Sequence, residues 1–279
     1  MQQFLGLDLG VMQGRLLPKY NGRFQAHPVG YWQNEFEVAR DIGFKHIEFI
    51  LDHNDALINP LLNAEGVTEI KKHIANTGVK VRSICADYFM EAPLHSADES
   101  VAQSSFQVMT HLMKSVGPLE TECIVLPCVD QSSVSSNADK ERLIRVLQKL
   151  SKNCEELNLT IALEMDLNPD EFHFLLKELP ETITVNYDTG NSAALGFDIE
   201  EEFDAYGHRI SDIHLKDREL GGGSVKLGKG NTDFKKVIQS IKKINYNGII
   251  VMQAYRDDEG VGILKAQLNT LQNIESAYQ

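Results

Sequence analysis

TIALEMDLNPDEFHFLLKELPETITVNYD (160–188) contains two apolar, β-branched runs with an amphipathic stretch between them. The flanking runs 160–165 and 182–187 are typical of buried strands in a parallel sheet. Between them, Asn168 suits an N-cap and Pro169 suits the first position of a helix. A strand, a helix and a second strand in this order predict a βαβ unit.

The same alternation runs through the whole chain. The predicted strands are 4–12, 45–50, 79–86, 122–127, 160–165, 182–187, 210–215 and 248–253. The predicted helices are 33–42, 64–77, 98–115, 138–157, 169–178, 198–206, 232–244 and 260–276. Eight units in 279 residues predict an α/β fold, a closed (β/α)8 TIM barrel with a single domain over residues 1–279.

The composition narrows the classes of partner. The chain has 27 basic and 40 acidic residues, a net charge of −13, and no dense stripe of Lys and Arg. A field of this sign disfavours nucleic acid and anionic membranes, so we expect a small-molecule substrate. A homo-oligomer is possible and stays open.

Other features of the chain favour a cytoplasmic protein. The four cysteines match no zinc-finger or CxxC spacing, so we expect reduced thiols. The N-terminus lacks the positive region of a signal peptide and contains Asp8. No apolar stretch approaches the roughly 20 residues that a membrane-spanning helix needs.

Four polar side chains stand where four predicted strands end: Glu164, Asp188, His214 and Gln253. In a parallel barrel the carboxyl ends of the strands meet at one face, where active sites are assembled. Oxygen donors with one imidazole nitrogen suit a divalent cation such as Mn, Mg, Co or Zn. The sequence therefore predicts one divalent metal ion held by these four residues.

Each of these residues also has a simpler interpretation. Glu164 and Asp188 could cap the helices that follow, and Asp188 precedes Thr-Gly-Asn, which strengthens that alternative. His214 could be a buried histidine with ordinary hydrogen bonds. Lys216 lies on the same side of its strand as His214 and could contact substrate or form an ion pair with a nearby acid. Gln253 could bind substrate only.

Further polar residues at or beyond the strand ends are candidates for substrate binding: Arg15, Glu48, Asp87, His95, Arg218 and Arg256. Arginine suits a phosphate or carboxylate, although each one alone could be an ordinary surface residue. The segment 14–33 is an unusually long loop after the first strand, where function usually resides in a barrel. The glycine-rich segment 221–230 lacks the P-loop signature and predicts a flexible loop over the barrel mouth.

Several motifs resemble the xylose isomerase-like TIM-barrel superfamily of sugar phosphate isomerases and epimerases. They are GVMQGRLLP (10–18), HIEFI (46–50), IALEMD (161–166), NYDTGN (186–191), DIHLKDR (212–218), LGKGNTDF (227–234) and MQAYRD (252–257). The resemblance implies that Glu164, Asp188, His214 and residue 253 bind one metal, and that Glu164 is a catalytic acid or base. Residue 253 is usually a second catalytic Glu in these enzymes, but here it is Gln.

The resemblance implies an isomerase, or an epimerase, of a small sugar or sugar phosphate. Glu164 would remove the proton next to the carbonyl, and Lys216 would help to stabilise the enediolate. Because Gln253 cannot transfer protons, isomerisation is favoured over epimerisation. The alternatives are a dehydratase or lyase, a non-catalytic sugar-binding member, and an endonuclease IV-like phosphodiesterase.

Overall fold

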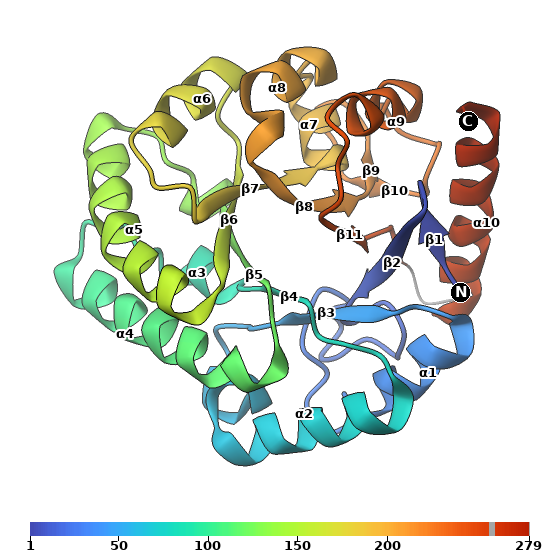
Figure 1. The fold of residues 1–279 in the computed structure, drawn as a ribbon, viewed down its shortest axis with the longest axis horizontal. Coiled ribbons are helices and arrows are strands. Elements are labelled where there is room, and N and C mark those ends of the chain that lie inside the picture. The colour runs from blue at the N-terminus through green and yellow to red at the C-terminus, as the bar shows by residue number, and fades with distance from the viewer. Residues whose placement is uncertain (257–259, 279) are drawn as a thin grey trace.

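The computed structural model describes residues 1–256 and 260–278 and is a closed barrel of eight parallel strands (Figure 1). The strands are β2 (Leu7–Met12), β3 (His46–Ile50), β4 (Ser83–Cys85), β5 (Cys123–Cys128), β6 (Thr160–Met165), β7 (Ile183–Asp188), β8 (Ile210–Leu215) and β11 (Ile249–Met252). They pair in chain order, and β2 pairs with both β3 and β11, which closes the barrel. The predicted (β/α)8 TIM barrel is confirmed.

Helices surround the barrel on the outside (Figure 1). The main ones are α1 (Asn34–Ile42), α2 (Ala64–Thr77), α4 (Glu99–Val116), α5 (Asn137–Leu157), α6 (Pro169–Lys177), α8 (Ile199–Tyr206), α9 (Phe234–Lys243) and α10 (Val261–Tyr278). The capping signals act as predicted at α6, where the Asn168 side chain accepts a hydrogen bond from the Glu171 backbone and Pro169 is the first helical residue.

The structure corrects two sequence predictions. The predicted strand 4–12 is divided, because Leu5 (φ 54°) and Gly6 (φ 79°) form a turn between β1 (Gln3–Phe4) and β2. The predicted flexible loop 221–230 includes one strand of an antiparallel hairpin, β9 (Asp217–Arg218) with β10 (Ser224–Val225). Asp257, the last residue of the MQAYRD motif, lies outside the described residues.

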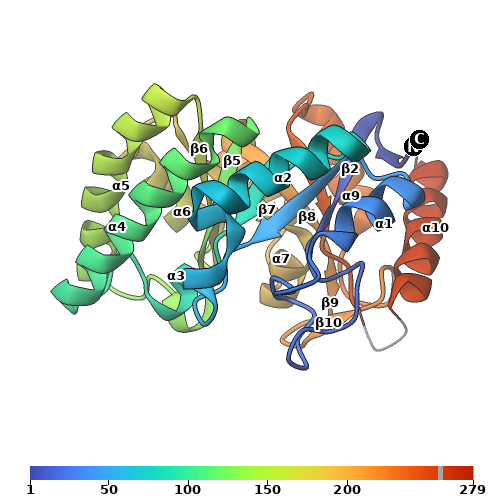
Figure 2. The same ribbon diagram turned by 90° about the horizontal axis from the view of Figure 1, so that it is seen from below.

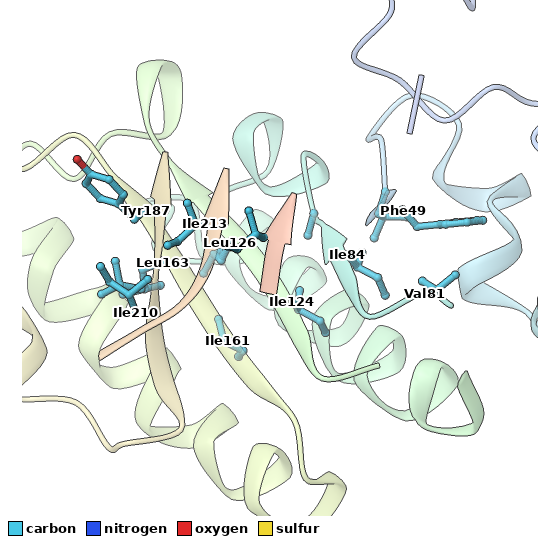
Figure 3. Close-up of a cluster of buried hydrophobic side chains, with 14 of the residues drawn as sticks. Phe49, Val81, Ile84, Ile124, Leu126, Ile161, Leu163, Tyr187, Ile210 and Ile213 are labelled. Atoms are coloured by element: carbon cyan, nitrogen blue, oxygen red, sulfur yellow. The ribbon is translucent and has the colours of Figure 1, made fainter. Parts of the chain in front are cut away.

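Strand alternation separates two buried layers. Ile161 and Leu163 of β6 face outward into the layer between strands and helices, together with Ile124, Leu126 and other residues drawn in Figure 3. Ala162, between them, belongs to a second cluster inside the barrel. Because successive side chains of a strand point to opposite faces, Glu164 points inward like Ala162.

The connections after the strands gather on one face of the barrel. Short elements that the sequence did not predict follow β4 and β7, namely α3 (Tyr88–Glu91) and α7 (Thr189–Leu195). Figure 2 shows α3, α7 and the β9–β10 hairpin on the same side of the barrel. This side is the carboxyl-terminal face, where barrels of this kind carry their sites.

Candidate functional site

Three of the four predicted metal ligands meet at the carboxyl-terminal mouth of the barrel. Glu164, Asp188 and His214 each offer one ligand atom, and these atoms lie within 4.8 Å of one another. The exposed fractions of the three residues are 6%, 4% and 0%. The strands β6, β7 and β8 that carry them are consecutive neighbours in the barrel. Two carboxylates and an imidazole at this spacing can hold a divalent cation.

Gln253 follows β11, which pairs with β8 beside His214. Its side-chain oxygen Oε1 is buried and has no hydrogen-bond partner among the residues that the structure describes. A buried acceptor without a partner is costly and rare in folded proteins. A cation or a substrate hydroxyl would satisfy this oxygen, so its state supports the predicted role of Gln253 at the site.

The electrostatics of the cluster also fit a cation. Burial and the nearby charge of Asp188 raise the pKa of Glu164 to about 7. Four buried carboxylates lie in and beneath the mouth, those of Glu48, Glu164, Asp188 and Asp212. Lys216 lies 3.2 Å from Asp188, and Arg218 donates to Asn191 at the mouth. With a neutral His214 ring and all four carboxylates ionised, the acids exceed these two cations by two charges, which a divalent cation would neutralise.

Asp188 has the capping role that the sequence allowed, and its second oxygen remains for the predicted metal role. Its Oδ1 accepts hydrogen bonds from the backbone N–H groups of Gly190 and Asn191, both at 2.8 Å, and so caps α7. Its Oδ2 lies 3.2 Å from Nζ of Lys216. The cap fixes the carboxylate, and the second oxygen stays directed toward the cluster.

Asn191 is a site residue that the sequence analysis missed. Its Nδ2 donates to Oε1 of Glu164, and its Oδ1 accepts from Nη1 of Arg218 at 2.7 Å. Nζ of Lys216 lies 3.5 Å from the same Oδ1. Asn191 therefore connects Glu164, Lys216 and Arg218, three side chains at the mouth that could contact substrate. Its position three residues after Asp188, in the first turn of α7, is the signal that could have identified it.

A second cluster lies beneath the first. Oε1 of Glu48 is 2.8 Å from Nε2 of His214, and Oδ1 of Asp212 is 3.4 Å from the same nitrogen. The other oxygen of Glu48 accepts from Oγ of Ser83 at 2.6 Å, and Asp212 accepts from Asn186 at 2.8 Å. Glu48, Asp212 and His214 are fully buried.

This lower cluster could also hold a cation by its composition. The lower cluster is fully buried, however, whereas Glu164 and Asp188 stand at the carboxyl ends of β6 and β7, where barrels of this kind bind their substrates. Metal-bound histidines usually donate their other ring N–H to a carboxylate. We therefore assign Glu48 to the positioning of His214, with Nδ1 of the ring left for the cation, in place of the substrate contact expected from the sequence. Asp212 could have been found as the inward-facing residue two positions before His214.

Arg15 and Arg256 anchor the long loop 14–33, and their predicted contacts with substrate stay predictions. Arg15 is 4% exposed and donates to the backbone oxygens of Phe24 (2.8 Å) and Ala254 (3.2 Å). Arg256 is also 4% exposed and donates to the backbone oxygen of Gly14. Burial lowers the pKa of Arg15 to about 10. Both guanidinium groups tie the segment 14–33 to the end of β11.

Asp87 and His95 have partners of their own. Asp87 is half-buried and accepts from Nε2 of Gln25 at 3.2 Å and from Sγ of Cys85 at 3.1 Å. His95 is buried, its backbone oxygen accepts from Arg142 at 2.7 Å, and burial lowers the pKa of its ring. Neither residue belongs to the two clusters, so their predicted contacts with substrate stay predictions.

The glycine-rich loop binds an acid of the protein itself. Oδ2 of the buried Asp217 accepts from the backbone N–H groups of Lys229 (3.1 Å) and Gly230 (2.9 Å), and Oδ1 accepts from Thr232 (3.1 Å). A Cβ at Gly230 would lie 2.4 Å from Oδ1 of Asp217, so only glycine fits there. These backbone N–H groups are therefore occupied by Asp217 and are not directed at an external anion.

The parallel barrel and the carboxylate–histidine cluster at its mouth together define a candidate metal-binding (β/α)8 barrel. The model of the family "Xylose isomerase-like TIM barrel" matches residues 36–274. The chain belongs to this family.

Two relatives cover most of the chain. One from Haemophilus influenzae, provisionally named an L-ribulose-5-phosphate 3-epimerase, is 27% identical in an alignment of 267 positions that covers 88% of this chain and 92% of the relative. An L-ribulose-5-phosphate 3-epimerase of Escherichia coli is 24% identical in an alignment of 257 positions that covers 87% of this chain and 90% of the relative.

Solved structures share the fold at lower identity. D-psicose 3-epimerase from Clostridium cellulolyticum H10, solved with D-tagatose, has a TM-score of 0.76 and 15% identity over 98% of this chain and 99% of its own. The IolI protein with a bound zinc atom has a TM-score of 0.76 and 17% identity over the same shares. Among the described residues, none of the helices has the length and apolar character to cross a membrane.

Proposed function

We propose that the protein is a metal-dependent epimerase of a small keto sugar or keto-sugar phosphate. It is an enzyme of the epimerase type, as its relatives and structural neighbours are. The observation that carries the proposal is the convergence of Glu164, Asp188 and His214 at the mouth of the barrel. The unpartnered oxygen of Gln253 beside them supports a fourth ligand.

A bound divalent cation would polarise the carbonyl and stabilise negative charge on the adjacent oxygens. The proposed residues for holding it are Glu164, Asp188, His214 and Gln253. Structural neighbours include one with zinc and one with magnesium.

Glu164 is the proposed base. Its pKa of about 7 is close to the working range of a group that takes and returns a proton near neutral pH. Asn191 donates to its Oε1 and fixes the carboxylate in one orientation. Glu164 would remove the proton from the carbon beside the carbonyl and leave an enediolate.

Epimerisation needs a second group that delivers a proton to the opposite face. Gln253 cannot do so, and Glu48 is fully buried beneath His214. Lys216 is the proposed second group: its side chain is 15% exposed, and it lies on the far side of Asp188 from Glu164. Glu164 and Lys216 would then form a mixed carboxylate–ammonium pair.

A specific observation favours one second candidate, a member that binds a sugar without chemistry. The amide at Gln253 replaces the carboxylate that the resemblance places there. Proton NMR in D₂O separates the two. With Mn²⁺ or Mg²⁺ and a panel of ketoses and ketose phosphates, the proposal predicts exchange at the carbon beside the carbonyl and appearance of the 3-epimer. Binding without exchange would favour the second candidate, and an aldose product would mean isomerisation.

The Glu48→Gln variant is expected to weaken metal binding by about 10- to 100-fold, the usual effect of losing a partner behind a metal-bound histidine. The physical reason is the loss of the charge 2.8 Å from Nε2 of His214. Isothermal titration with Mn²⁺ measures it. Glu35→Gln is the matched control, because Glu35 is equally buried on α1 and lies outside both clusters. Equal effects of the two variants would contradict the assignment.

Metal should stabilise the protein more strongly at high pH. Burial raises the pKa of Glu164 to about 7 and that of Asp212 to about 8, so both bind protons more tightly in the folded chain than in the unfolded chain. The stability of the metal-free protein therefore falls as pH rises from about 4 to about 8. Burial would lower the pKa of His214, but Glu48 raises it to about 10, which acts in the same direction.

A metal ion binds only the deprotonated carboxylates, and at high pH its positive charge offsets the repulsion that protons relieve at low pH. The rise in Tm on adding Mn²⁺ should consequently be larger at about pH 8 than at about pH 5.5. Differential scanning fluorimetry at both pH values checks it. The same rise in Tm at both values would show that these carboxyl groups do not bind the ion.

A further inference from the structure

A second cavity, of about 180 Å³, adjoins the proposed base. Asn191 lines this cavity, and its Nδ2 donates to Oε1 of Glu164. A sugar whose reacting carbon lies at Glu164 would extend its remaining carbons and hydroxyl groups into this space. The groups that line the cavity therefore decide what the far end of the substrate can be.

The charged groups of this cavity are one arginine and two aspartates, namely Arg218, Asp130 and Asp166. Nε and Nη2 of Arg218 donate to the backbone oxygen of Gly222 at 3.0 and 2.8 Å, and Nη1 donates to Asn191 at 2.7 Å. The guanidinium thus ties the β9–β10 hairpin to α7. The two carboxylates exceed its charge, so the cavity has a net negative charge.

The other groups expected to bind an anionic tail are engaged within the protein. Arg15 and Arg256 are buried and donate to backbone oxygens. The N–H groups of Lys229, Gly230 and Thr232 are occupied by Asp217. A phosphate carries about 1.5 to 2 negative charges at neutral pH and needs such donors.

We infer that the substrate of this site is a free sugar without a phosphate, and that its far end donates hydrogen bonds to Asp130 and Asp166. Hydroxyl groups suit these carboxylates, and an amino group would suit them as well. This inference rests on the proposed function and narrows its substrate class. It separates the chain from relatives that are named for a sugar phosphate.

The test compares matched pairs on the metal-loaded protein: L-ribulose with L-ribulose 5-phosphate, and D-fructose with D-fructose 6-phosphate. Deuterium exchange by NMR gives kcat/KM, and calorimetry gives the binding constant. We expect kcat/KM or affinity at least tenfold higher for the free sugar of a pair. Equal values, or a preference for the phosphate, would overturn the inference and leave the proposed function intact. Absence of both exchange and binding for every sugar would overturn both.

Two double variants test whether the cavity acids cause the preference for the free sugar. Replacing both cavity acids, Asp130→Asn with Asp166→Asn, should reduce the preference for the free sugar at least fivefold. Asn tolerates the left-handed backbone of residue 130 (φ 51°), so the first substitution suits the fold. The control is Asp170→Asn with Asp139→Asn, which removes the same charge outside the cavity and should leave the preference unchanged. The same reduction in both double variants would show that overall charge, and not this cavity, determines the preference for the free sugar.

Discussion

Glu164→Gln is expected to abolish exchange of the proton beside the carbonyl, with a loss of about 10²- to 10⁴-fold in rate, the range that a positioned acid or base contributes. The variant keeps the shape of the side chain and its contact with Asn191. It removes the only group of the upper cluster whose pKa is raised to about 7. Deuterium exchange followed by NMR, at saturating Mn²⁺, measures the loss.

Metal saturation must be shown separately, because Glu164 is also a proposed ligand. Calorimetry with Mn²⁺ on the same variant gives its occupancy. Lys216→Met is the informative companion: exchange should persist because Glu164 still removes the proton, whereas formation of the 3-epimer should fall. Exchange by Glu164→Gln within about twofold of the unmodified protein would refute the assignment of the base.

His214→Ala and Asp188→Ala are expected to lose metal altogether at micromolar concentrations. Each removes a direct ligand, so the effect should exceed the about 10- to 100-fold loss from an outer partner such as Glu48. His214 has the larger role in the structure, since its ring also contacts both carboxylates of the lower cluster. Elemental analysis after dialysis, with circular dichroism to confirm folding, gives the result.

His27→Gln is the control for these two variants. His27 is also buried, at 1% exposure, and it lies outside both clusters, beside Oε1 of Gln13. It should retain one ion per chain. Unchanged metal content in both His214→Ala and Asp188→Ala would exclude those ligands.

Most of the fold could be predicted because its signals are local. Apolar, β-branched runs of six to nine residues and amphipathic stretches alternate eight times, and caps such as Asn168 fix where helices begin. The turn at Leu5 and Gly6 was missed because Leu gives no sign of a positive φ. The hairpin β9–β10 was missed because two-residue strands lack a period that could be recognised.

The candidate site could be predicted where strand alternation alone positions a residue. Glu164, Asp188 and His214 are inward-facing positions at strand ends, and the barrel brings such positions together. The partners of long side chains could not be predicted in the same way. Arg15 and Arg256 reach backbone oxygens far away in the sequence, and only the folded path of the segment 14–33 reveals this.

The depth of a residue along the barrel axis could not be predicted from the sequence either. Glu48 stands near the end of its strand in the sequence, yet Ser83 and His214 enclose it beneath the mouth. Because strands in a barrel are staggered, equal positions along two strands do not lie at equal heights. The sequence therefore predicted which polar residues face the barrel interior better than it predicted their depth below the mouth.

Anomalous scattering from crystals grown with Mn²⁺ is the most direct test of the central claim. The account predicts one ion at the mouth, within about 2.0–2.6 Å of ligand atoms from Glu164, Asp188 and His214. Gln253 should approach the same ion through its Oε1. An ion in the lower cluster of Glu48, Asp212 and His214, or no ion at either place at saturating Mn²⁺, would contradict it.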